Sequence, residues 1–135
     1  MEKTGTILNI VKKYELYLLV YFGSYMTEFY HAESDIDIAF LAKKPLSSKE
    51  KVSLLEDLII YHRKSEIDLV DLQTADPILR YEIGSKGRLI YEAEEGLFER
   101  YSLYYLKRIY ELKPIIQEEM NALKQAVRDV IDNAW

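Results

Sequence analysis

Four short segments of the chain have the hydrophobic pattern of β-strands. Residues 16–22 are apolar throughout and rich in β-forming side chains, which is typical of a strand buried on both faces. Residues 35–41 begin with a strict alternation of Asp and Ile, the pattern of a strand with one buried face. Shorter apolar runs over residues 67–72 and 88–91 predict two more strands. We therefore expect a sheet of about four strands.

Helices are predicted before and between these strands. Apolar residues cluster on one side of residues 7–14, which indicates a short helix. Ser47 and Glu50 have the spacing of a capping box, so a helix is expected to begin there and to end near His62.

A further helix is predicted from the dipeptide Asp76-Pro77. Asp accepts hydrogen bonds from the free amide groups of a first helical turn, and Pro fits that turn because it needs no amide partner. Gly84 and Gly87 are expected to end this short helix.

From residue 94 onward the chain has a long helical periodicity, which Pro114 is expected to end or kink. Beyond it lies a second apolar stripe, close to heptad spacing, formed by Ile116, Met120, Leu123, Val127 and Val130 (or Ile131). The stripe predicts packing on the sheet or a surface for a protein partner, and we favour the partner because the preceding elements already close a core. The expected organisation is a core over residues 1–92 and C-terminal helices over residues 93–135 that pack on the core, on a partner or on both.

Composition narrows the possible functions. The chain has 135 residues and no cysteine, so disulfide scaffolds and thiolate chemistry are excluded. Its 23 acidic residues outnumber 18 Lys and Arg, which argues against a nucleic-acid partner because basic residues supply affinity for the phosphate backbone. Since no apolar run approaches the ~20 residues of a membrane span and no export signal is recognisable, we expect a cytoplasmic protein without membrane contact.

Acidic residues in two of the predicted strands form a candidate catalytic site. Asp35 and Asp37 point the same way along a strand and present paired carboxylates. Such a pair repels unless a cation lies between the charges, and its oxygen atoms suit Mg²⁺. If the strand of Asp68 lies beside that of Asp35 and Asp37, its carboxylate completes an arrangement suited to two-metal phosphoryl transfer. Asp71 is the alternative third ligand and faces the other way, since the two residues are three positions apart.

A turn motif lies at a fixed distance before this pair. Gly23 allows close approach of the backbone to a phosphate, and Ser24 offers a hydroxyl and an amide. With the ten residues that follow and then Asp35 and Asp37, the pattern resembles the Gly-Ser-x10-Asp-x-Asp motif of the minimal nucleotidyltransferases (MNT) of the DNA polymerase β superfamily. The similarity runs over residues 16–91. It implies an α/β (α+β) fold, with a nucleotidyltransferase-like mixed sheet of about four strands flanked by helices and a helical C-terminal extension.

The resemblance also implies an activity and a set of site roles. The family transfers a nucleoside monophosphate, most often AMP from ATP, to a hydroxyl. Asp35 and Asp37 would bind both of two Mg²⁺ ions, and Asp68 would bind one and help to deprotonate the acceptor. Gly23 and Ser24 would hold the β- and γ-phosphates.

The length and helicity of the C-terminal region resemble those of MNT antitoxins that pair with HEPN toxins. The resemblance thus implies the antitoxin of a type VII-like toxin–antitoxin system, a protein adenylyltransferase that modifies a tyrosine of a HEPN ribonuclease toxin. Two alternatives stay open: transfer to a small-molecule hydroxyl of the antibiotic type, and a catalytically weak module that neutralises its partner by binding.

One departure from the family pattern concerns the loop after the Gly-Ser pair. Members commonly have Gly four residues after the Ser, often with an Arg nearby, whereas this chain has Glu28 and no Lys or Arg over residues 25–34. Because an acidic side chain near a triphosphate repels it, we expect weakened ATP binding.

Overall fold

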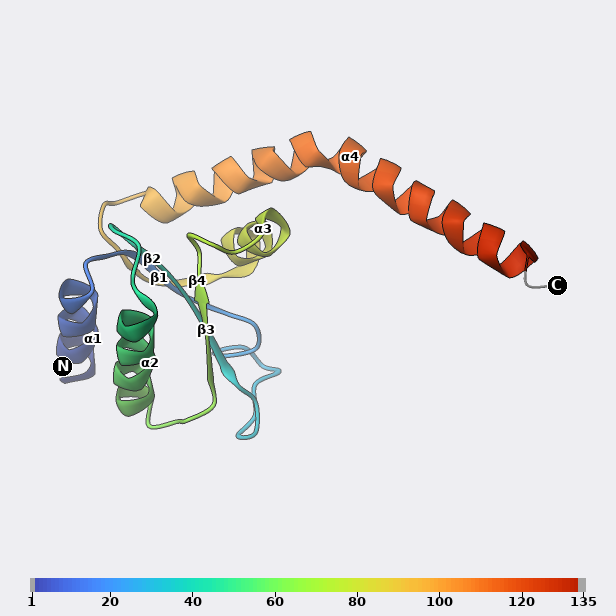
Figure 1. The fold of residues 1–135 in the computed structure, drawn as a ribbon. Coiled ribbons are helices and arrows are strands. Elements are labelled where there is room, and N and C mark those ends of the chain that lie inside the picture. Colours follow the sequence, from blue (N-terminus) through green and yellow to red (C-terminus); the bar gives the residue numbers. More distant parts are fainter. Residues whose placement is uncertain (1, 134–135) are drawn as a thin grey trace.

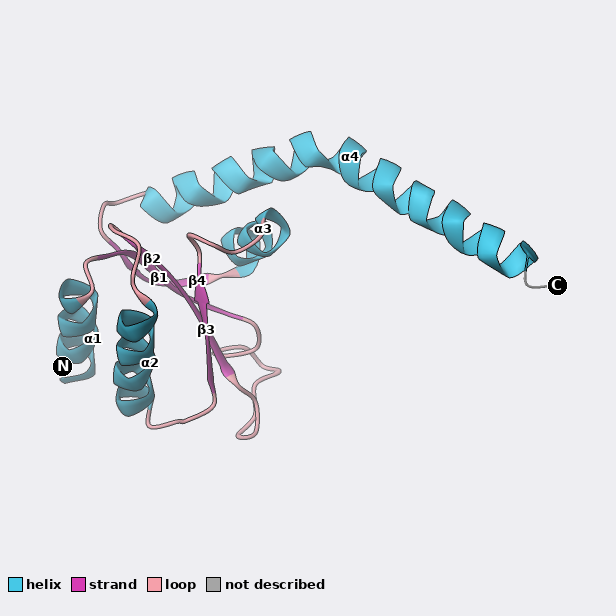
Figure 2. Ribbon diagram, viewed as in Figure 1, coloured by secondary structure: helices cyan, strands magenta, loops and turns pink. Residues whose placement is uncertain are grey.

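The structure, a computed structural model, describes residues 2–133 and contains one four-stranded sheet with helices on both faces (Figures 1 and 2). The strands are β1 Leu16–Phe22, β2 Ile36–Ala42, β3 Ile67–Asp71 and β4 Arg88–Glu92. They lie in the order β3-β2-β1-β4, with β1 antiparallel to both β2 and β4 and with β2 parallel to β3. The predicted mixed sheet of four strands is confirmed.

Two layers of helices cover this sheet. The helices of the described chain are α1 Glu2–Lys13, α2 Ser48–His62, α3 Pro77–Lys86 and α4 Leu97–Asn133. Figure 1 shows α1 and α2 side by side on one face, and α3 with the beginning of α4 on the other. Each layer therefore closes its own hydrophobic core against the sheet.

The central strand β1 contributes to both cores. Leu19 packs among buried residues of α1 and α2, whereas Leu18 and Val20 pack with Ile83 of α3. All three β1 side chains have no exposed surface. The prediction that this strand is buried on both faces is confirmed, because helices cover the sheet from both sides.

The alternation in β2 decides which face carries the acidic residues. Ile36, Ile38 and Phe40 belong to the core formed with α1 and α2, whereas Ala39 belongs to the core on the other face. Side chains of a strand alternate between faces, so Asp37 lies on the same face as Ala39. This is the face covered by α3 and α4.

The predicted helix caps are present. The Ser47 hydroxyl accepts a hydrogen bond from the Glu50 amide at 3.1 Å, and the Glu50 carboxylate accepts one from the Ser47 amide at 3.0 Å. The helix that follows ends at His62, as predicted. At the start of α3, the Asp76 carboxylate accepts a hydrogen bond from the Leu79 amide at 2.9 Å.

The prediction that Gly84 ends α3 is wrong, since α3 continues through it and ends at the cap residue Gly87. A Cβ atom at Gly84 would lie 3.1 Å from Cα of Ser102 in α4. This glycine therefore serves the close packing of two helices, a tertiary role that the sequence pattern does not reveal.

Pro114 does not end the C-terminal helix, which runs without interruption through it. Figure 1 shows the axis of α4 bending about midway, which agrees with the predicted kink and with the loss of a backbone hydrogen bond at Pro. Before the bend, α4 packs against α3; after it, the helix extends away from the sheet, and residues 117–133 are all exposed. None of the helices within residues 2–133 has the length and apolar character needed to cross a membrane.

Candidate active site

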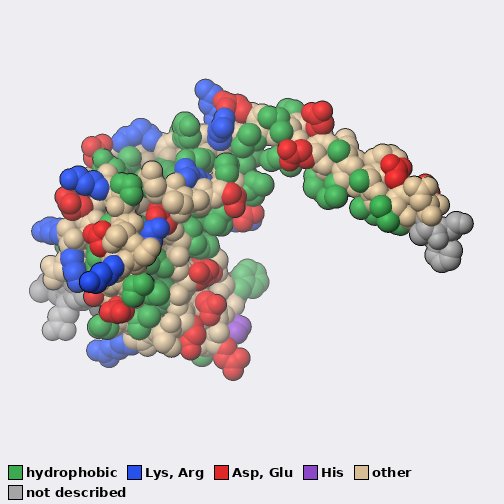
Figure 3. All heavy atoms as spheres, viewed as in Figure 1, with side chains coloured by type: hydrophobic (Ala, Val, Ile, Leu, Met, Phe, Trp, Pro, Cys, Tyr) green, Lys and Arg blue, Asp and Glu red, His purple; other side chains and the backbone are tan. Residues whose placement is uncertain are grey.

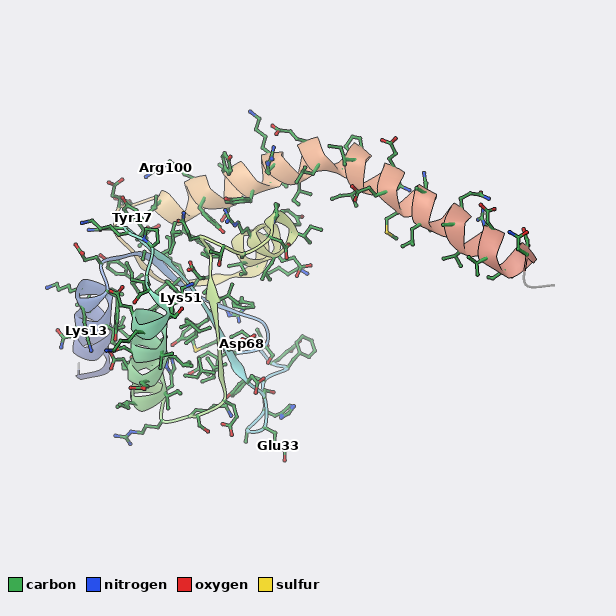
Figure 4. The ribbon with its side chains drawn as sticks, in the orientation of Figure 1. Lys13, Tyr17, Glu33, Lys51, Asp68 and Arg100 are labelled. Carbon is green, nitrogen blue, oxygen red and sulfur yellow. The ribbon has the colours of Figure 1, made fainter. Side chains whose placement is uncertain are left out.

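The strand ends bring the predicted site residues to one end of the sheet. β1 ends at Phe22, directly before Gly23, and Phe22 is aligned with Asp37 near the start of β2. In the parallel pair of β2 and β3, Asp37 is aligned with Asp68. Aligned residues of neighbouring strands point to the same face, so the carboxylates of Asp37 and Asp68 are neighbours. Figure 4 shows Asp68 at this end of the sheet.

Gly23 is required at its position for two reasons. Its φ of +67° lies in the left-handed region that favours glycine. In addition, a Cβ atom at Gly23 would lie only 2.1 Å from Oδ2 of Asp37. The backbone turn after β1 is therefore packed directly against the Asp37 carboxylate, which unites the Gly-Ser turn and the acidic pair in one site.

Ser24 presents unused hydrogen-bonding groups at the same turn. Its carbonyl accepts a hydrogen bond from the Thr27 amide at 2.9 Å, which closes a tight turn. Within residues 2–133, neither the Ser24 amide nor its hydroxyl makes a hydrogen bond. Both groups are thus available to oxygen atoms of a ligand, and their role in binding phosphate stays a prediction.

The carboxylate of Asp37 is influenced by burial and by two neighbouring carboxylates. Burial raises the pKa of Asp37, and the negative charges of Asp68 and Asp35 raise it further. Asp35 is exposed and lies one residue before β2. The strand that the sequence predicted from residue 35 thus begins one residue later, at Ile36. The repulsion among these groups is the kind that a bound cation relieves.

The donor set fits Mg²⁺ better than a metal held entirely by protein ligands. Among residues 2–133, no three His, Asp or Glu side chains form a compact metal-binding group. Asp35 and Asp68 are exposed, and Asp37 is half-buried, so these side chains border an open surface. Mg²⁺ typically binds through one or two carboxylates and completes its shell with water and phosphate oxygens, which matches this geometry.

Asp71, the alternative third ligand, lies on the opposite face of the sheet. It is aligned with Phe40 of the α1 and α2 core, and its Oδ2 atom forms an ion pair of 2.9 Å with Nζ of Lys51 in α2. Its Oδ1 atom accepts a hydrogen bond from the Gln73 amide at 2.9 Å. The structure therefore brings Asp68, and not Asp71, beside Asp37.

This placement predicts different outcomes for two matched substitutions. We expect Asp68→Asn to reduce nucleotidyl transfer by about 100-fold or more, because it removes the carboxylate that would bind Mg²⁺ beside Asp37. Asp71→Asn is expected to retain activity and to lower the free energy of unfolding by about 1–2 kcal/mol through loss of the Lys51 ion pair. Initial rates measure the activity of both variants, and chemical denaturation measures their free energies of unfolding. An active Asp68→Asn variant beside an inactive Asp71→Asn variant would reverse the assignment.

An aromatic cluster that the sequence did not reveal holds the loop between β1 and β2. The ring of Tyr25 packs edge-to-face on Tyr21 and Tyr30, with centroid distances of 4.7 and 5.0 Å. Nζ of Lys64 donates a hydrogen bond to the Ala32 carbonyl at 2.7 Å. The rings of Tyr25 and Tyr30 pack against the core formed with α1 and α2, so these contacts hold the loop without the glycine and arginine of the family pattern.

His62 supports this cluster from the end of α2. Its Nδ1 atom lies 2.8 Å from the Leu58 carbonyl, and its Nε2 atom lies 2.7 Å from the Tyr21 hydroxyl. Because a carbonyl only accepts, Nδ1 donates the hydrogen bond to Leu58. The sequence offered only the position of His62 at a helix end.

Arg88 is a further residue that the sequence pattern did not single out. Its Nη2 atom donates a hydrogen bond to the Gly23 carbonyl at 2.8 Å. The pairing of β4 with β1, which places Arg88 opposite Tyr21, brings this basic residue to the turn from 65 positions away.

Comparison with known proteins identifies relatives of this chain. A family model described as polymerase beta nucleotidyltransferase matches residues 5–96. The protein adenylyltransferase MntA of Shewanella oneidensis is 33% identical over 81 residues, which make up 60% of this chain and 58% of that protein. The alignment thus spans less than two thirds of MntA.

Solved structures extend the similarity over more of the chain. A chain in a toxin–antitoxin crystal structure with AMP-PNP superposes with a TM-score of 0.69 at 26% identity, covering 87% of this chain and 98% of that one. A chain in the complex of a tri-AMPylated Shewanella oneidensis HEPN toxin with its MNT antitoxin superposes with a TM-score of 0.64 at 25% identity, covering 88% and 97%. The predicted nucleotidyltransferase-like fold is confirmed, including the long C-terminal helix.

Proposed function

The chain belongs to the polymerase beta nucleotidyltransferase family, and from this membership we propose that it is a Mg²⁺-dependent protein adenylyltransferase. It transfers AMP from ATP to a tyrosine of a HEPN ribonuclease toxin and thereby acts as the antitoxin. The observation that carries the proposal is the aligned pair Asp37 and Asp68 beside the turn at Gly23. The likeness to toxin–antitoxin complexes with AMP-PNP and with an AMPylated toxin supports the nucleotide and the acceptor. Because the substrate is ATP, we place the reaction in the cytoplasm.

The reaction is a single displacement at phosphorus. The tyrosyl oxygen of the toxin attacks the α-phosphorus of ATP and forms a new O–P bond. The bond from the α-phosphorus to the oxygen that bridges the β-phosphate breaks, and pyrophosphate leaves with the electron pair. Asp68 is the proposed acceptor of the tyrosyl proton, and Gly23 and Ser24 are the proposed ligands of the β- and γ-phosphates. Such transfers depend mainly on positioning and charge.

Asp35 and Asp37 are the proposed ligands of two Mg²⁺ ions, and Asp68 of one of them. When bound, the ions neutralise phosphate charge and polarise the α-phosphoryl group. The raised pKa of Asp37 among its acidic neighbours supports this role, since the same crowding attracts a cation.

The second half of α4 is the proposed contact surface for the toxin. Its apolar stripe is exposed and consists of Met120, Leu123, Val127 and Val130. Figures 1 and 3 show this part of the helix extending from the sheet, with hydrophobic side chains along it. The stripe alternates spacings of three and four residues, the pattern by which one helix packs against another.

If this surface binds the toxin, substitutions in it are expected to weaken toxin binding without changing ATP binding. The double substitution Leu123→Asp/Val127→Asp is expected to weaken toxin binding at least tenfold, because it removes apolar contacts from the centre of the stripe. Stability and ATP affinity are expected to stay unchanged, since these side chains are 58% and 49% exposed. The control Asn121→Asp/Gln125→Asp adds the same charge to the opposite side of the helix. Co-purification and calorimetry of both variants measure the difference, and equal toxin affinity in both would contradict the surface.

One experiment tests the proposed function. The chain is incubated with ATP, Mg²⁺ and a purified HEPN-type toxin encoded beside it, and mass spectrometry then follows the toxin. We expect the added mass of one or more AMP groups on a toxin tyrosine, together with loss of ribonuclease activity. An unmodified toxin that is nevertheless neutralised would instead support inhibition by binding. An adduct on a small-molecule hydroxyl, with none on the toxin, would support the antibiotic-type alternative.

A further inference from the structure

The loop that follows the Gly-Ser turn lacks a positive charge. Residues 25–34 contain no Lys or Arg, and the exposed Glu28 lies among them. A triphosphate at Gly23 and Ser24 therefore gains no electrostatic attraction from basic residues of this loop. The structure brings Arg88 to this turn.

Arg88 is held at the end of the sheet by backbone contacts. It is the first residue of β4 and is half-buried. Its Nη2 atom donates to the Gly23 carbonyl at 2.8 Å, and its Nη1 atom donates to the Lys86 carbonyl at 3.3 Å. Its Nε atom is buried and has no hydrogen-bond partner among residues 2–133. Most buried polar groups of folded proteins have a hydrogen-bond partner. The unpaired Nε atom therefore indicates that the two carbonyl contacts fix the position of the guanidinium.

The contact with Gly23 controls a peptide group of the candidate site. In a trans peptide, the carbonyl of Gly23 and the amide of Ser24 point in opposite directions. When Arg88 holds the carbonyl, the Ser24 amide points away from Arg88 and away from β4. That amide and the Ser24 hydroxyl are the groups without hydrogen bonds within residues 2–133. The orientation of the Ser24 amide therefore depends on the contact between Arg88 and the Gly23 carbonyl.

We propose that Arg88 is a positioning residue for the triphosphate of the nucleotide. By holding the Gly23 carbonyl, it directs the Ser24 amide and hydroxyl toward the β- and γ-phosphates. It also brings a positive charge to the turn, where residues 25–34 supply none. The inference rests on the proposed nucleotidyltransferase function. It assigns a role in substrate binding to a residue of β4, whereas the Gly-Ser turn follows β1.

The test compares ATP with AMP, since AMP lacks the phosphates that Arg88 serves. Affinities of the full chain for both nucleotides are measured with Mg²⁺ by calorimetry, in wild type and in Arg88→Gln. We expect Arg88→Gln to weaken ATP binding about tenfold and AMP binding less than twofold, because a charge-assisted hydrogen bond and a nearby cation are lost. Arg88→Lys keeps the charge and is expected to recover part of the ATP affinity.

The matched control is Arg100→Gln in α4. Arg100 is exposed and, like Arg88, donates to a backbone carbonyl, that of Glu95; it also binds the Glu94 carboxylate. This variant is expected to bind ATP as wild type does. Equal weakening of ATP and AMP by Arg88→Gln, or unchanged ATP binding, would overturn the inference while leaving the proposed function in place. A wild-type chain that binds no ATP would overturn both.

Discussion

Replacing Asp37 with Asn is expected to reduce AMP transfer to the toxin by about 10³-fold or more. Asp37 is half-buried, whereas Asp35 and Asp68 are exposed, and it is both aligned with Asp68 and in contact with the Gly23 turn. Asn keeps the shape of the side chain but removes the charge that would attract Mg²⁺ and order the phosphates. Initial rates of AMP incorporation at saturating ATP and Mg²⁺ measure the effect.

The loss of activity in Asp37→Asn is expected without a loss of stability. A raised pKa means that the ionised carboxylate is less favourable in the folded chain than in the unfolded chain. Asn removes the repulsion from Asp68 and Asp35, so the melting temperature is expected to stay the same or to rise. Asp129→Asn, in the exposed part of α4, is the matched control and is expected to keep the wild-type rate. A folded Asp37→Asn variant with more than about a tenth of wild-type activity would contradict the assigned role.

Gly23→Ala is expected to cause the second large effect, a loss of about 100-fold in the transfer rate. A methyl group at this position would lie 2.1 Å from Oδ2 of Asp37, so the carboxylate or the turn must move. A shift of about 1 Å in a catalytic group is enough to cost two orders of magnitude in rate. The residue would also adopt a left-handed conformation at a cost of roughly 1–2 kcal/mol in stability.

The control Gly96→Ala separates the effect of the contact with Asp37 from the effect of backbone strain. Gly96 has a φ of +82°, but a Cβ atom there would meet only Nη1 of Arg100 at 3.4 Å, an ordinary contact. We expect this variant to lose a similar amount of stability and to keep its transfer rate. Denaturation curves and rates of both variants are compared. If the two glycine substitutions reduce the rate equally, backbone strain explains the loss and contact with Asp37 does not.

The local parts of the fold could be predicted because their causes lie close together in the chain. Ser47 and Glu50 form the predicted capping box, since both partners belong to the same helical turn. The alternation around Asp37 predicted a strand with one apolar and one acidic face. The apolar run of β1 predicted burial on both sides, and the structure supplies a helical layer on each.

Predictions failed or stayed open where the cause was a contact between distant segments. Glycine is typical of helix ends, but Gly84 lies inside α3, where α4 packs closely against it. Asp68 and Asp71 have similar surroundings in the sequence, and only the strand order assigns one to the carboxylate face and the other to Lys51. His62 gained its contact with Tyr21 only when α2 packed on the sheet.

The sequence by itself determined the chemical groups of this protein: a Gly-Ser turn, a pair of carboxylates at a fixed spacing, and a long amphipathic C-terminal helix. These depend on spacing within one or two elements, which the chain carries as a pattern. The tertiary structure alone decided that Asp68 shares the end and the face of Asp37, and that Arg88 holds the carbonyl of Gly23. Strand pairing makes these choices, because hydrogen bonds between strands align residues that are far apart in the chain and turn them to a common face.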